Sequence, residues 1–193
     1  MKKCFFSTIF MLFSLVLVSP AFASEIDSLI LEDLIEKGEI IYMDDEITVR
    51  SFGNDQEVSD AIFNHPNSVT AINENPFLRS SITGPGGRAS IVDADSGRAV
   101  FWSVKPATAW PYNFSGTVKL RYHSGFARDA SVGGMGALGS TVSGMVTMNK
   151  NNGGVAYLED TAYAISGDKY TILPGVHTSF RPNWLKRVEC AQI

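Results

Sequence analysis

The side chains best suited to acid–base or metal chemistry are three histidines, His65, His123 and His177. Imidazole titrates near neutral pH and binds zinc, so a hydrolase would place one of them beside a Ser, a Cys or a carboxylate. The sequence contains no H-E-x-x-H pair and no G-x-S-x-G turn, however. We therefore predict no catalytic site and no metal site, and keep a secreted hydrolase or toxin subunit centred on His123 or His177 as an alternative function.

Two stretches match known binding motifs only in part. Residues 134–139 fit the pattern G-x-G-x-x-G, but a dinucleotide site needs a strand before it and a helix after it, and neither is indicated here. Asp93 and Asp95 begin like a calcium loop, but the glutamate required at its twelfth position is missing. The neighbouring acids Glu159 and Asp160 could help to gather a cation, although adjacent acids are usually solvated. We predict a flexible or close-packed glycine segment, a plain hairpin turn and no cofactor.

The stretch between residues 106 and 123 carries the binding residues that we favour. Three aromatic side chains alternate in a proline-punctuated linker, and three cationic ones alternate in the strand that follows, namely Trp110, Tyr112 and Phe114, then Lys119, Arg121 and His123. Aromatic rings on a loop can stack on a sugar or anchor a protein partner, and a cationic row could receive an acidic partner. The alternative is structural: the loop would cap an open end of the sheet, and the charged row would only keep a wet face soluble.

β-strands should position these residues, because the second half of the sequence has a strong β pattern. Residues 89–92 and 98–104 flank a glycine-containing turn, which predicts a hairpin, and the second of these strands is apolar on both faces, as a central strand is. Residues 117–123 alternate between apolar and polar, which predicts one core face and one wet face. We expect residues 141–148 and 155–165 to pair as a second hairpin. Further strands are expected at 40–43, 47–52, 169–173 and 176–180.

Helices are indicated only in the first part of the chain. Residues 24–37 and 57–64 carry apolar side chains at helical spacing. The run Gly84-Pro85-Gly86-Gly87 is the strongest break in the sequence and separates a mixed α/β part, 24–86, from an antiparallel β part, 87–193. We predict that both parts belong to a single β-rich domain, since about 60 residues are marginal for an independent one.

The first 23 residues have the pattern of a secretory signal peptide. Lys2 and Lys3 precede an apolar run, 4–18, which is followed by the small-residue sequence Ser19 to Ala23. Removal of this segment after Ala23 would change the formal charge from −4 to −6, which disfavours nucleic acid as a partner. We therefore expect an exported protein, periplasmic or secreted, that has no membrane span after the leader is removed.

Cysteine usage limits how the exported chain can be cross-linked. Only Cys190 would remain, because Cys4 lies in the predicted leader. One cysteine cannot form an intramolecular disulfide, but it could form an intermolecular one. The alternative is an inert thiol near the end of the chain.

Together these observations predict a fold more firmly than a function. We expect an α+β, mainly β domain, with an antiparallel β-sandwich or barrel-like sheet and one or two N-terminal helices. The favoured function is an exported, non-catalytic binding protein that recognises a protein or a carbohydrate through the aromatic loop. Besides the hydrolase, a subunit of a surface assembly that pairs through an open sheet edge remains an alternative, as does a homo-oligomer.

Overall fold

The computed structural model describes residues 33–34, 37–65, 80–94, 96–137, 139–149, 153–166 and 170–181 of the 193-residue chain. The predicted signal peptide, most of the helix predicted over 24–37 and Cys190 lie outside the described residues. Among the described residues, no helix is long and apolar enough to cross a membrane.

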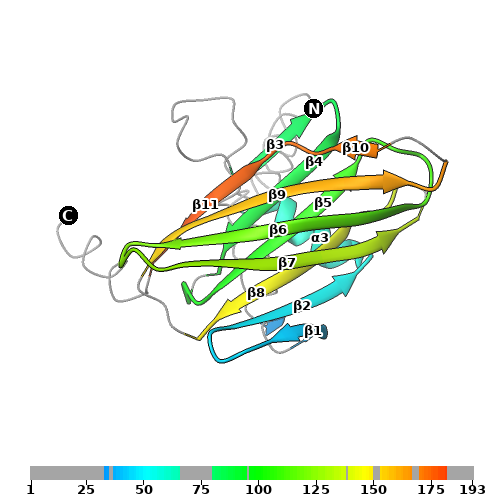
Figure 1. Cartoon of the computed structure of the whole chain (residues 1–193). Helices are drawn as coiled ribbons and strands as arrows, with labels where there is room; N and C mark the ends of the chain where they lie inside the picture. Colours follow the sequence, from blue (N-terminus) through cyan, green and yellow to red (C-terminus); the bar gives the residue numbers. More distant parts are fainter. Residues whose placement is uncertain are drawn as a thin grey trace, which may run out of the picture.

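Two antiparallel sheets packed face to face form the body of the protein (Figure 1). Sheet A has the order β1-β2-β8-β5-β4-β3, and sheet B has the order β7-β6-β9, with β10 and β11 both pairing with β9. Sheet A contains β1 (Glu39–Met43), β2 (Ile47–Gly53), β3 (Ser81–Gly84), β4 (Gly87–Asp93), β5 (Ala99–Pro106) and β8 (Val142–Met148). Sheet B contains β6 (Tyr112–Tyr122), β7 (Ala127–Gly136), β9 (Gly154–Ala164), β10 (Tyr170–Ile172) and β11 (Val176–Phe180). The predicted β-sandwich is confirmed, and the sheets do not close into a barrel.

The main core lies between the two sheets, because alternate side chains of each strand point into that space. On β6 the inward side chains include Val118, Leu120 and Tyr122, all buried, as the alternation in the sequence predicted. They pack with buried residues of sheet A such as Ile91 and Val104. β5 is paired on both sides, by β4 and β8, and nearly all of its residues are buried. The prediction of a central strand here is therefore confirmed.

One helix, α3 (Gln56–Asn64), covers the outer face of sheet A. Asp55 caps its N-terminus by accepting hydrogen bonds from the backbone N–H groups of Glu57 and Val58, which would otherwise lack partners. The apolar side of the helix packs on a second core cluster that includes Val58, Ile62, Val92, Phe101 and Met145. Sheet B faces the viewer in Figure 1 and α3 lies behind both sheets. The described residues thus form three layers, and none of the described elements covers the outer face of sheet B.

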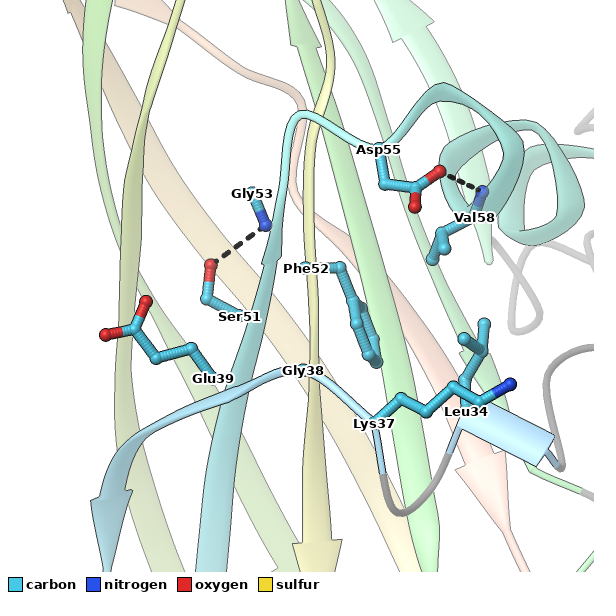
Figure 2. A pocket seen from close by; sticks show the side chains of 9 residues that line it. All are labelled: Leu34, Lys37, Gly38, Glu39, Ser51, Phe52, Gly53, Asp55 and Val58. Atoms are coloured by element: carbon cyan, nitrogen blue, oxygen red, sulfur yellow. Dashed lines mark hydrogen bonds between the residues drawn. The ribbon is translucent and has the colours of Figure 1, made fainter.

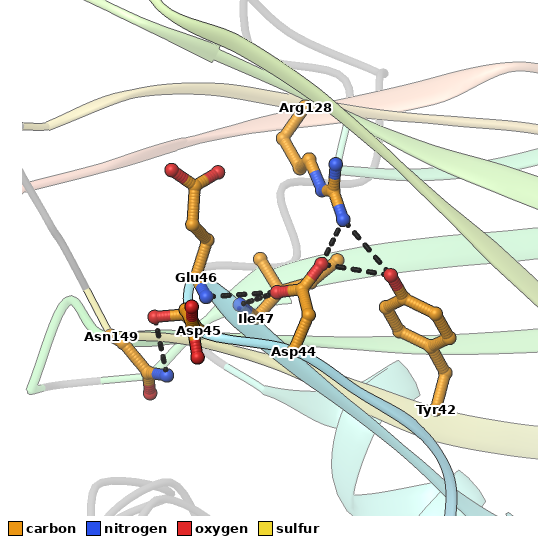
Figure 3. Close-up of polar contacts among 7 residues, drawn as sticks. All are labelled: Tyr42, Asp44, Asp45, Glu46, Ile47, Arg128 and Asn149. Carbon is orange, nitrogen blue, oxygen red and sulfur yellow. Dashed lines mark hydrogen bonds and ion pairs between the residues drawn. The ribbon is translucent and has the colours of Figure 1, made fainter.

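An ion pair joins the two sheets along the side where β1 and β7 form their edges (Figure 3). Arg128 of β7 donates from Nη2 to the carboxylate of Asp44, in the turn between β1 and β2, and to the hydroxyl of Tyr42 at 3.0 Å. The other oxygen of Asp44 accepts hydrogen bonds from the backbone N–H groups of Glu46 and Ile47, each at 2.8 Å. Asp44 therefore stabilises the turn between β1 and β2 and also binds Arg128 of the opposite sheet.

The hairpin expected after residue 123 is wrong, and one of the two interpretations of the glycine-rich segment is excluded. Residues 141–148 and 155–165 do not form a hairpin, because β8 pairs with β2 and β5 in sheet A while β9 pairs with β6 in sheet B. Residues 133–136 of the glycine-rich segment form the end of β7 and not a flexible loop. Gly136 is required there because a Cβ atom would lie 2.2 Å from the Tyr112 ring. The close-packed interpretation of these glycines is the one that fits.

Strand pairing also joins the two parts of the sequence that flank the Gly84–Gly87 turn. That turn connects β3 to β4, which pair in register from Ser81 with Ser90 to Gly84 with Gly87. β2, from the first part, pairs with β8, from the second, over the length of both strands. Residues on either side of the turn therefore share one sheet.

Candidate functional site

The structure separates the three aromatic residues that the sequence placed together on a loop. Tyr112 and Phe114 begin β6 and point into the core, where they are 0% and 1% exposed. The Tyr112 hydroxyl donates to the carbonyl of Ser140 at 2.9 Å, and burial raises its pKa to about 12. The Phe114 ring packs on the Trp102 ring, with centroids 5.3 Å apart. The expected aromatic loop is corrected accordingly, since only Trp110 of this set is exposed and free to meet a partner directly.

The three cationic residues do not form an unpaired row. Lys119 Nζ lies 2.5 Å from a carboxylate oxygen of Glu159 on β9, and Arg121 Nη1 lies 2.6 Å from one of Asp129 on β7. The hydrogen bond from Arg121 lowers the pKa of Asp129, so this carboxylate is ionised at neutral pH. His123 follows the end of β6, in an exposed turn. The described face is therefore balanced in charge rather than cationic.

The outer face of sheet B is organised in rows of side chains that cross β7, β6 and β9. Met135, Asn113 and Tyr163 form the first row, because the register pairs Asn113 with both of the others. Gly133, Ser115 and Thr161 form the next row, which carries only small groups. Ser131, Thr117 and Glu159 follow, and the ion pairs and the Tyr157–His177 stack lie beyond them. One end of the face is thus apolar and the rest is polar.

Four large exposed side chains gather at the apolar end, and we call this set the apolar patch. It consists of Met135, Tyr163, Ile165 and Trp110, which are 69%, 52%, 65% and 60% exposed. The backbone N–H of Ile165 donates to the carbonyl of Pro111 at 2.8 Å, which places Ile165 next to the loop that carries Trp110. Tyr163 lies two residues earlier, on the outer face of β9 near its end. The patch therefore continues from the sheet onto the loop between β5 and β6.

The described histidines occupy three separate places. His177 of β11 stacks on Tyr157 on the open outer face of sheet B, with ring centroids 5.5 Å apart. His65 is buried at the C-terminus of α3, and His123 lies in the turn after β6. Within the described ranges no three His, Cys, Asp or Glu residues lie close enough together to hold a metal ion.

The partial motifs also take structural roles. Gly134 and Gly136 belong to β7, Gly139 lies in a turn with a φ of +76°, and the element that follows is strand β8 rather than a helix. The geometry of a phosphate loop is therefore not formed. Asp93 ends β4 and is buried, and the chain turns there into β5, so the predicted hairpin is confirmed. Asp95 lies outside the described residues.

One open pocket of about 450 Å³ lies beside the start of α3 (Figure 2). Leu34, Phe52 and Val58 supply its apolar wall, while Lys37 and Asp55 lie at its rim. Asp55 already caps the helix, and Lys37 pairs with Asp33. Ser51 Oγ accepts a hydrogen bond from the backbone N–H of Gly53 at 3.2 Å, and Glu39 lies opposite Ser51 on β1.

A comparison of the sequence with protein-family models and with curated proteins finds no match. The function must therefore be argued from the geometry alone. The apolar patch offers aromatic, thioether and aliphatic groups, and the amide of Asn113 lies between Met135 and Tyr163. Such groups favour desolvation against another surface over proton transfer or bond cleavage.

Sequence reasoning missed Met135, Tyr163 and Ile165. Tyr157 and Tyr163 share the odd positions of β9 with Glu159 and Thr161, and Ile165 follows the end of the strand, so the alternation of β9 carried part of the signal. An apolar residue on an otherwise polar strand face is the pattern that would have revealed the patch. Met135 was hidden by the glycines around it, which do not suggest a strand.

Proposed function

We propose that this is an exported, non-catalytic binding protein that takes a protein partner on the apolar patch. The observation that carries the proposal is the grouping of Trp110, Met135, Tyr163 and Ile165 at one end of an otherwise polar sheet face. Trp, Tyr and Met are enriched in protein interfaces, where a desolvated centre is surrounded by a polar rim. The hydroxyl row of Ser115 and Thr161 would supply such a rim. The leader-like sequence at residues 1–23 supports export.

The choice of a protein over a carbohydrate depends on the aliphatic members of the patch. Sugars stack on flat rings and need hydrogen-bonding groups nearby, which Trp110, Tyr163 and Asn113 could provide. Met135 and Ile165 have no such use for a sugar, but they give a protein partner apolar area to bury. At about 25 cal/mol per Å² of buried apolar surface, they would supply much of the binding free energy.

Capture experiments with the mature protein test this proposal. The double variant Met135→Ser/Ile165→Ser removes the aliphatic half of the patch, and Tyr157→Ser removes an exposed ring from the far end of the same face as a matched control. We expect immobilised wild type and the Tyr157→Ser protein to retain one partner from the exported fraction, and the double variant to lose it. Equal retention by all three proteins would refute the proposal. If the protein instead binds a glycan, and this binding depends on Trp110 and Tyr163 but not on Met135 and Ile165, the partner is a carbohydrate and not a protein.

A second candidate function, a subunit of a homo-oligomeric surface assembly, is favoured by edge strand β1. Ile40, Ile41, Tyr42 and Met43 are 44–66% exposed on this strand. An antiparallel pairing of two copies centred on Ile41 would place Lys37 of each opposite Asp45 of the other, so the charges are complementary. A bulge at Ile41 interrupts the ladder of β1, so apolar side chains would have to contribute more than backbone hydrogen bonds.

Mass measured as a function of concentration tests the assembly. We expect sedimentation of the wild type to show a dimer that dissociates on dilution, and Ile41→Lys/Met43→Lys to stay monomeric because charged edge strands resist pairing. The control Tyr157→Lys adds a charge away from the edge and should dimerise as the wild type does. A wild type that is monomeric at every concentration would rule out this function.

A further inference from the structure

Asp160 is a carboxylate that points into the sandwich instead of into water. It lies on β9 between Leu158 and Ala162, which are both fully buried and face the core. Both carboxylate oxygens are buried, and neither has a hydrogen-bond partner. The expectation that Glu159 and Asp160 are both solvated is therefore wrong for Asp160. A buried ionised carboxylate without a partner is costly, so this position needs a physical explanation.

The strands on either side of Asp160 leave room for it. Across β6 its register partner is Gly116, where a Cβ atom would lie 2.8 Å from the Asp160 Cβ and 3.0 Å from the Phe114 ring. On the other side the edge of sheet B is interrupted. β10 ends where Ile172 pairs with Thr161, and β11 begins where Val176 pairs with Leu158.

Leu173, Pro174 and Gly175 pass Asp160 in the gap between these two edge strands. We call residues 173–175 the edge break. Leu173 is buried in the main core, whereas Pro174 has no N–H group with which to continue the ladder. The edge break is thus a short segment that runs beside Asp160 along the edge of sheet B, where the ladder between β9 and its edge strands is interrupted.

Among the described residues, no cation faces Asp160 to compensate its charge. The described titratable groups that face the core from neighbouring strands are Tyr112 and Tyr122 of β6, both with pKa values raised to about 12, and Asp93 of β4, which has contacts of its own. The described inward residues of β5 and β11 are uncharged. Lys119 and Glu159 are paired with each other on the opposite face of sheet B. Burial alone raises the pKa of Asp160 to about 7.

We propose that Asp160 is a pH switch for the edge of sheet B. When the carboxyl is protonated, residues 173–175 close over it and the sandwich is sealed. When it ionises, the carboxylate moves toward water and the edge break opens. The closed form binds the proton more tightly than the open form does, so closure is fully stable in acid and weakens as the pH rises through about 7. The switch is independent of the proposed binding function.

Hydrogen exchange at the edge break, compared between variants at equal pH, tests the switch. Asp160→Asn keeps the size of the side chain but cannot ionise, and Asp129→Asn makes the same charge change at an exposed position of the same sheet. Relative to Asp160→Asn, the wild type should lose roughly tenfold in protection of the amide groups of Leu173, Gly175 and Val176 between pH 6 and pH 8. The Asp129→Asn protein should behave as the wild type does. If the protection of these amides differs between the wild type and Asp160→Asn by the same factor at pH 6 and at pH 8, the proposal is wrong.

A direct titration keeps the proposal testable if Asp160→Asn does not fold. Carbon-13 NMR of the wild-type carboxyl carbons should give one aspartate with an apparent pKa near 7, absent from the unfolded chain. If every aspartate of the folded protein titrates near 4, the switch does not exist.

Discussion

Trp110 and Tyr112 are two residues apart and lie in opposite environments, which makes them a sensitive pair for testing the fold. We expect Tyr112→Ala to lower the free energy of unfolding by about 3–5 kcal/mol, because it removes a fully buried ring and leaves the carbonyl of Ser140 without its partner. We expect Trp110→Ala to change it by about 0.5 kcal/mol or less, because an exposed side chain loses little on truncation. Urea unfolding followed by fluorescence measures both changes.

The Tyr112→Phe protein is the control for this pair. It keeps the ring and loses only the hydroxyl, so its stability should fall between the other two, by about 1 kcal/mol. If Tyr112→Ala is as stable as Trp110→Ala, Tyr112 lies on the surface and the start of β6 is misplaced.

The inward position of Tyr112 and Phe114 was within reach of the sequence. Both share even numbering with Val118, Leu120 and Tyr122, the predicted core face, so extending the alternation backwards would have placed them in the core. Ser115 and Gly116 concealed this extension, because neither residue favours a strand. The ion pairs of Lys119 and Arg121 could not be predicted, since their partners come from β9 and β7 and depend on register.

At the scale of elements, the contact of Arg128 with Asp44 tests how the two sheets are held together. We expect Arg128→Met to destabilise the protein by about 1–2 kcal/mol, because a partly buried charged pair is lost while the aliphatic length of the side chain is kept. The loss should shrink in high salt, which screens the pair in the wild type. Thermal unfolding at low and high ionic strength measures it.

Lys119→Met provides the comparison, because it breaks a more exposed pair within one sheet. Its cost should be below about 1 kcal/mol. Equal costs for the two variants would show that the contact between the sheets contributes no more than a surface pair does.

The wrong hairpin at residues 141–165 shows what sequence patterns leave open between elements. An Asn- and Gly-rich loop separates β8 from β9, and such loops connect neighbouring strands and opposite sheets equally well. The distinguishing feature is burial. β8 is buried on both faces, as a central strand of a covered sheet must be, whereas β9 alternates because one face of sheet B is wet. The helix α3, by contrast, was predicted within one residue at its start, since its apolar spacing and the proline after it are local signals.

At the scale of the whole molecule, composition and alternation were sufficient for the architecture. The short strands with turns between them predicted an antiparallel sandwich, and the structure has one. The order of the strands was not predictable, because it is decided by contacts between residues far apart in the chain. The apolar patch was not predictable for the same reason, since its members come from β7, from β9 and the turn after it, and from the loop before β6, and these segments become neighbours only in the folded sheet.

The central place of β8 in sheet A determines when that sheet can form. β1 and β2 lie early in the chain, yet β2 joins β5 only through β8, whose first residue is Val142. In a chain that stops before this point, β2 and β5 each keep one edge unpaired, and such edges recruit other chains. Folding should therefore be slow and late, limited by the search for contacts of large sequence separation. Aggregation is therefore expected from the incomplete sheet rather than from the finished molecule.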